Sequence, residues 1–111
     1  MNSVEPLNQP VPLLHPTTLQ KLTGNLIRRL RELQGISQGD LARMSEANLS
    51  YISSIESGKN NISIGKLFAL SNALRLSPSS LVNILVQINR SILLDRDDAE
   101  SADEDTGLPL T

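Results

Sequence analysis

The chain has 111 residues and a formal net charge of −2, which is the size of one small domain with tails. It contains no cysteine and one histidine, which excludes disulfides, thiolate zinc sites, cysteine nucleophiles and histidine pairs that bind metal. No serine has a histidine or lysine base at a recognisable spacing, and the carboxylates of the central segment are few and scattered. We therefore expect no catalytic residue, no cofactor and no metal, and a protein that is not an enzyme.

The chain has no run of about 18 apolar residues, the length that a membrane-spanning helix requires. Its first residues, MNSVEPLNQP, are acidic and proline-rich, unlike a signal peptide. These features predict a cytoplasmic protein that makes no contact with a membrane.

Charge is distributed unevenly along the chain. Residues 17–94 carry nine basic and four acidic side chains, a net charge of +5, whereas residues 95–111 carry seven acidic side chains and one arginine, a net charge of −6. A basic central segment favours a polyanionic partner. The acidic tail is either a competitor for that partner or an aid to solubility.

The two ends of the chain differ in composition from the middle. Residues 1–16 contain four prolines, which fix the backbone and remove hydrogen-bond donors, so we expect an extended arm. Its leucines and Val11 can pack on a partner or on the domain. Residues 95–111 are acidic, lack apolar periodicity and contain Gly107 and Pro109, which predicts a disordered tail.

Five helices are predicted between these ends. The first covers residues 18–34, where leucines and Ile27 recur at steps of three and four, and Gly35 ends it. Gly24 lies inside this helix and weakens it, so its first turns are expected to fray.

The remaining helices follow from capping residues. Ser37 with Asp40 three residues later predicts the start of the second helix, and Asn48 predicts the start of the third, which Gly58 ends. Ser63 begins the fourth helix, and Ser77 followed by Pro78 begins the fifth. No segment alternates at period two, so we predict an all-α fold.

Residues 37–58, SQGDLARMSEANLSYISSIESG, contain two short helices joined by a tight connection. Ala42 is small enough for the helices to cross closely, and Leu41, Ile52 and Ile55 supply the core between them. The second of these helices also carries polar side chains with no evident core role. This arrangement is typical of a helix-turn-helix, whose second helix enters the DNA major groove.

Residues 22–85 resemble the DNA-binding domain of the phage repressor and Cro-type family, also called the xenobiotic-response-element family. The resemblance rests on an ordered set of side chains at the family's spacing: Gln38, Ala42, Ile52, Ile55, Glu56 and Gly58. It implies that residues 17–94 form a compact five-helix, lambda-repressor-like DNA-binding domain, flanked by the arm and the tail.

The resemblance also implies roles for individual residues. The base-contacting positions are Asn48, Leu49, Ser50 and Ser54. The positions expected at phosphates are Gln38, Tyr51, Ser53, Lys59, Asn60 and Asn61. Gln38 is also expected to brace a side chain of the third helix, and Tyr51 to pack partly on the second. Arg31 and Glu56 match a structural ion pair that joins the first helix to the third.

Two features depart from the family pattern. Glu46 stands in the turn where glycine is usual, so we expect the turn to differ locally. The third helix has no Arg, Lys or Gln, the side chains that make two-pronged base contacts. Leu49 can contact a thymine methyl group and the serines can make single hydrogen bonds, with DNA shape and water contributing to specificity.

The fifth helix is apolar around most of its circumference, more than one small core can cover. We expect a homodimer through Leu81, Val82, Leu85, Ile88 and Ile92, although the proline-rich arm is an alternative cover. A two-fold dimer places its third helices about 34 Å apart on a palindrome.

The sequence thus predicts a dimeric, nucleoid-associated transcriptional repressor that binds an inverted repeat in double-stranded DNA. An antitoxin or a restriction–modification controller that regulates its own operon is an alternative. Another is an adaptor that uses the fold for protein interaction, with the tail or the arm contacting a protein partner.

Overall fold

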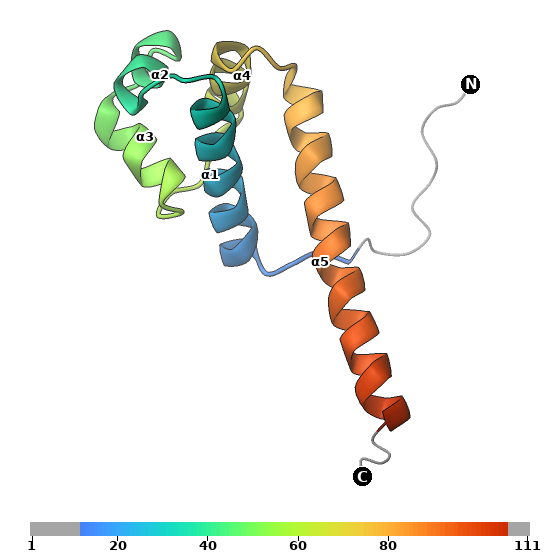
Figure 1. Cartoon of the computed structure of the whole chain (residues 1–111). Coiled ribbons are helices and arrows are strands. Elements are labelled where there is room, and N and C mark those ends of the chain that lie inside the picture. The colour runs from blue at the N-terminus through green and yellow to red at the C-terminus, as the bar shows by residue number, and fades with distance from the viewer. Residues whose placement is uncertain (1–11, 107–111) are drawn as a thin grey trace, which may run out of the picture.

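The computed structural model describes residues 12–106, with side-chain surroundings from Pro12 to Asp97. Among these residues there are five helices and no strand, which confirms the all-α prediction (Figure 1). The helices are α1 (Pro16–Leu33), α2 (Gln38–Met44), α3 (Leu49–Glu56), α4 (Ile64–Ala73) and α5 (Pro78–Thr106). None of the helices in this part of the chain is long and apolar enough to cross a membrane.

The core is formed by apolar side chains from the first four helices, which pack around α2 and α3. Those buried most completely are Ile27, Leu41, Ile52, Ile55, Leu70 and Leu74. Ala42 is also buried, as a close crossing of α2 and α3 requires. Removing this much apolar surface from water is the main stabilising term for a domain without disulfides.

Side-chain caps begin the helices where the sequence predicts them. The Ser37 hydroxyl accepts from the Asp40 amide at 3.0 Å, and the Asp40 carboxylate accepts from the Ser37 amide at 3.2 Å. Asn48 Oδ1 accepts from the Tyr51 amide at 2.7 Å, and the Ser63 hydroxyl from the Lys66 amide at 3.2 Å. Each cap satisfies an amide that has no partner inside its helix.

Gly24 has a different role from the one predicted. It is buried where α1 crosses α3, and a Cβ atom there would overlap the carbonyl oxygen of Ile55. Fraying of the first turns, expected from this glycine, is not observed, because α1 is continuous from Pro16. The absent side chain lets two backbones approach, which offsets its helix-weakening effect.

The helix α5 is longer than predicted. Residues 95–106 continue it to Thr106, so the prediction of disorder from residue 95 was wrong over that range. The segment contains Arg, Ala and Glu, which are good helix formers, and no Gly or Pro interrupts it before Gly107. Figure 1 shows the end of α5 extending well past the other helices. The rest of the predicted tail, 107–111, lies outside the described residues.

The end of the proline-rich arm packs on α5. Leu14 is buried and its amide donates to Asn89 Oδ1 at 2.9 Å, while Asn89 Nδ2 donates to the Pro12 carbonyl at 3.1 Å. This contact fits the alternative in which the arm covers part of the last helix. Residues 1–11 of the arm, including Leu7 and Val11, lie outside the described residues.

Candidate nucleic-acid interface

The turn between α2 and α3 has a left-handed residue despite lacking glycine. Glu46 has φ 56°, a backbone region that costs most L-residues free energy. The Ala47 amide donates to the Ala42 carbonyl at 2.8 Å, and Lys66 Nζ from α4 donates to the Glu46 carbonyl at 3.0 Å. The absence of glycine led us to expect a locally different turn. The turn nevertheless keeps its left-handed residue, and these two hydrogen bonds stabilise it.

A buried ion pair joins α1 to the end of α3. Arg31 Nε lies 2.7 Å from Glu56 Oε2, and Arg31 Nη2 donates to Glu56 Oε1 at 3.0 Å. The two side chains are only 11% and 3% exposed. Arg31 Nη1 also donates to the Ile36 carbonyl at 2.8 Å, so one guanidinium connects α1, α3 and the loop before α2. The predicted structural pair is confirmed.

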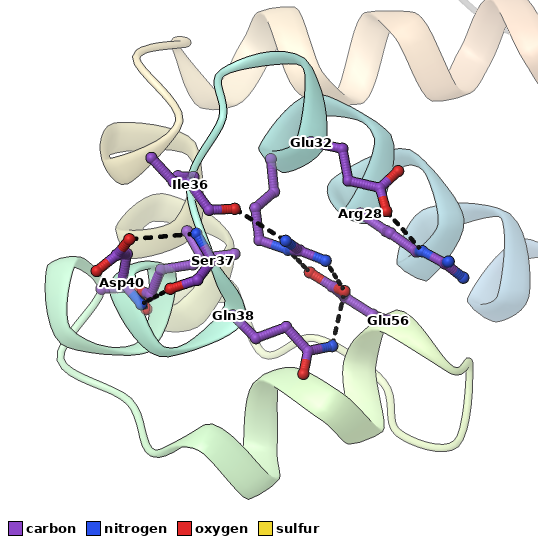
Figure 2. Close-up of polar contacts among 10 residues, drawn as sticks. Arg28, Glu32, Ile36, Ser37, Gln38, Asp40 and Glu56 are labelled. Atoms are coloured by element: carbon purple, nitrogen blue, oxygen red, sulfur yellow. Dashed lines mark hydrogen bonds and ion pairs between the residues drawn. The ribbon is translucent and has the colours of Figure 1, made fainter.

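Gln38 completes this network from the first turn of α2. Its Nε2 donates to Glu56 Oε1 at 2.9 Å, and Figure 2 shows the amide directed at the Glu56 carboxylate. The predicted bracing role of Gln38 is thus confirmed. The hydrogen bond that Arg31 makes with Glu56, together with the attraction between their opposite charges, raises the pKa of Arg31 above its ordinary value. The network fixes the orientation of α3 relative to α1 and α2.

The outward face of α3 consists of small side chains and one leucine. Leu49 is 54% exposed, Ser50 and Ser53 are exposed, and Ser54 is half-buried. Asn48, at the N-cap, is exposed as well, but its side-chain oxygen Oδ1 already accepts the hydrogen bond from the Tyr51 amide. All four predicted base-contacting positions therefore belong to one short helix and its cap, three of them well exposed.

Tyr51 and Lys66 form a second feature beside the start of α3. Tyr51 is half-buried, as expected of a residue that packs partly on its neighbours, and Lys66 Nζ lies 5.8 Å from the centre of its ring. Burial raises the pKa of Tyr51, against the effect of a backbone hydrogen bond from Ser63. Lys66 was not predicted as a site residue, because its position in the first turn of α4 shows no pattern that relates it to α3.

These two residues border a shallow hollow of about 350 Å³, which is also lined by Glu46, Ala47 and Asn48. The hollow lies at the amino-terminal end of α3, where free backbone amides and the helix dipole favour negative charge. Lys66 adds a full positive charge at its edge.

The remaining phosphate candidates lie in the loop after α3. Lys59, Asn60 and Asn61 are all exposed. Gln20 Nε2 donates to the Gly58 carbonyl at 2.9 Å, which attaches the start of this loop to α1. Gly58 has φ 78° and packs against Lys21, so glycine is required there for both conformation and space.

The predicted dimer residues on α5 do not share one environment. Leu81 is 0% exposed and packs inside the protomer, so its assignment to a dimer interface was wrong. It faces inward because α5 packs on α4 and α1. Val82 is exposed, Leu85, Ile88 and Ile92 are half-buried, and Val86 and Leu94 are further exposed apolar side chains.

Comparison with known proteins identifies the family. A family model described as helix-turn-helix matches residues 27–81, which contain α2, the turn and α3. An uncharacterized HTH-type transcriptional regulator, y4dJ, from Sinorhizobium fredii is 34% identical over 64 residues, covering 58% of this chain and 83% of the relative. The chain belongs to the helix-turn-helix family, as its resemblance to phage repressor and Cro-type proteins implied.

Solved structures of helix-turn-helix proteins have the same fold. The restriction-modification controller protein C.AhdI from Aeromonas hydrophila has a TM-score of 0.54 and 36% identity, with 58% of this chain and 96% of that chain covered. The controller C.Esp1396I, solved as a tetramer with its natural 35 base-pair operator, has a TM-score of 0.58 and 29% identity. The match covers 62% of this chain and 91% of that chain. The clp gene regulator ClgR from Corynebacterium glutamicum has a TM-score of 0.66 and 22% identity, and the match covers 78% of this chain and 93% of that chain. At this identity the likeness shows the fold alone.

Proposed function

We propose that this helix-turn-helix regulator binds an inverted-repeat operator in double-stranded DNA as a dimer and represses transcription. The observation that carries this proposal is the outward face of α3, which is free of core contacts while the Arg31–Glu56–Gln38 network fixes the helix behind it. A rigid helix with an exposed face of short side chains suits close approach to base edges in the major groove.

Affinity comes mainly from contacts to the DNA backbone. Lys59, Asn60, Asn61 and the Lys66 ammonium can meet phosphates on either side of the groove that α3 enters, together with Ser53 and Tyr51. Gln38 keeps one amide hydrogen beyond the one used by Glu56, and it lies in the first turn of α2. Such contacts release counterions, so binding is expected to weaken steeply as salt rises.

Dimer formation is proposed through the apolar side of α5 without Leu81. Val82 and Val86 are exposed, and Leu85, Ile88 and Ile92 are half-buried, so these side chains can bury further apolar surface against a second copy. Sedimentation velocity of the full chain tests this directly. Val82→Glu should shift the protein to a monomer. Ser91→Glu, an exposed change on the opposite side of the same helix from Val82, should not. A monomeric wild type contradicts the proposal.

The experiment that tests the function is capture of operator DNA. Purified protein is mixed with the fragmented source genome at about 0.15 M salt, a concentration that suppresses weak electrostatic binding, and the bound fragments are sequenced. Enrichment of promoter fragments that share an inverted repeat is expected. Bound fragments without a common sequence, or no enrichment above background, would leave the adaptor function as the better account.

Control of a restriction–modification operon is the second candidate. It is favoured by the similarity to C.AhdI, at 36% identity over 96% of that controller. The fragments recovered above decide between the candidates, because a controller must bind upstream of a neighbouring methyltransferase or nuclease gene. A toxin gene beside the captured site would instead indicate an antitoxin.

A further inference from the structure

The exposed face of α3 has an unusual chemical composition for a DNA-contacting helix. Leu49 is its only large apolar side chain, and its other exposed residues are Ser50 and Ser53, with exposed Ser57 at the C-cap. The single acidic residue of the helix, Glu56, is buried in the ion pair with Arg31. The face therefore presents one branched aliphatic group beside hydroxyls, without any charge.

Leu49 is exposed without a structural reason inside the protomer. It is the first residue of α3, follows the Asn48 cap and is 54% exposed, while the core of the domain is formed by Ile52 and Ile55 on the other side of the helix. Its neighbours Asn48 and Ser50 are also exposed. An aliphatic group in this position contributes favourable free energy only to a complex in which a ligand removes it from water.

The major groove offers one apolar group, the methyl on C5 of thymine. A methyl on C5 of cytosine occupies the same place on the pyrimidine ring, so an aliphatic contact does not distinguish the two. What differs is the adjacent group, which is an acceptor oxygen in thymine and a donor amine in cytosine. A serine hydroxyl both donates and accepts, so Ser50 is compatible with either base.

We propose that Leu49 recognises the C5-methyl group of a pyrimidine, and that α3 accepts thymine and 5-methylcytosine alike at that position. Unmethylated cytosine and uracil are disfavoured there, because the side chain then loses its apolar partner. This inference rests on the proposed function and adds the chemical class of base that the helix selects. In an operator that carries cytosine at this position, methylation of that cytosine strengthens binding.

The test uses a captured operator and pairs of probes that differ by one methyl group. At each pyrimidine of the half-site, thymine is compared with deoxyuridine opposite adenine, and 5-methylcytosine with cytosine opposite guanine. At one position, loss of the methyl should weaken binding about fourfold in both pairs, the effect of burying one methyl-sized group. Affinities are measured by fluorescence anisotropy with the full chain.

Variants assign the effect to the side chain. Leu49→Ala should bind thymine and deoxyuridine probes equally, and likewise the two cytosine probes, whereas Leu33→Ala, an exposed change at the end of α1, should keep both differences. Because any influence of the methyl on DNA shape persists in Leu49→Ala, only the contact itself is removed.

Three results would overturn the inference while the proposed function stands. These are specific binding with no methyl effect at any pyrimidine, a methyl effect that survives in Leu49→Ala, and an effect for thymine that is absent for 5-methylcytosine. Absence of sequence-specific binding to any captured fragment would instead refute the proposed function, and this inference with it.

Discussion

Replacing Gly24 by alanine tests how closely α1 and α3 must approach. A Cβ atom at this position would overlap the Ile55 carbonyl oxygen and would lie 3.0 Å from the Ile55 carbonyl carbon and 3.2 Å from that of Glu56. These are backbone atoms of a helix, which cannot rotate away as a side chain can. The variant must therefore separate α1 from α3, and the separation also strains the ion pair between Arg31 and Glu56.

The size of the effect follows from two opposing terms. Alanine favours the helical state of α1 by about 1 kcal/mol relative to glycine. Forcing an extra carbon into a packed core costs about 1–3 kcal/mol, and overlap with rigid backbone places Gly24→Ala at or above the upper end of that range. We expect a net loss of about 2 kcal/mol, which corresponds to a fall in melting temperature of about 8–16 °C for a domain of this size.

Thermal and urea unfolding followed by circular dichroism measure this loss. Gly65→Ala is the matched control, because that glycine is also helical and has nothing within 4 Å of the added carbon. The control should be as stable as wild type or more stable by up to about 1 kcal/mol. If Gly24→Ala is also as stable as wild type, the close approach of α1 and α3 is wrong.

Three further predictions concern single side chains. Glu56→Gln leaves the Arg31 guanidinium buried without its anion and should destabilise the domain by about 3–5 kcal/mol in urea unfolding, whereas Glu32→Gln, in an exposed pair, should cost less than about 1 kcal/mol. Glu46→Gly relieves the left-handed turn and should stabilise the fold by about 0.5–1 kcal/mol; a lower melting temperature would argue against strain there. The hydrogen bond from the Ser37 amide, together with one from Arg43, lowers the pKa of Asp40. The ionised carboxylate therefore stabilises the fold at pH values above the unfolded-state pKa of about 4. This stabilisation is lost as the pH falls through the lower pKa of the folded state. The stability advantage of wild type over Asp40→Asn should accordingly narrow in acid, and a constant difference from pH 7 to pH 2 would contradict this assignment.

Local signals in the sequence predicted most of the fold. The caps at Ser37, Asn48 and Ser63 each depend on a side chain bonding an amide within three residues, so chain order alone contains the information. The ion pair of Arg31 with Glu56 joins distant positions, and only the resemblance to a family made it predictable.

Features that depend on packing between distant elements were not predictable in this way. Gly24 resembles a helix-weakening residue until α3 is placed against it, and Leu81 resembles an exposed apolar residue until α5 is placed on α4. The contact of Leu14 with Asn89 spans 75 residues and has no sequence pattern. The length of α5 was underestimated because a run of acidic residues suggests disorder more strongly than the absence of Gly and Pro suggests helix.

If the outward face of α3 enters the major groove, one negative charge added to that face should prevent DNA binding. Ser50→Glu places a carboxylate on that face, and Asn25→Glu places the same charge on an exposed position of α1. Affinity for a captured operator is measured for both variants at equal salt, with circular dichroism to verify their helicity. Ser50→Glu should abolish specific binding, whereas Asn25→Glu should retain almost all of it. Equal binding by the two variants, both folded, would contradict the placement of α3 in the groove.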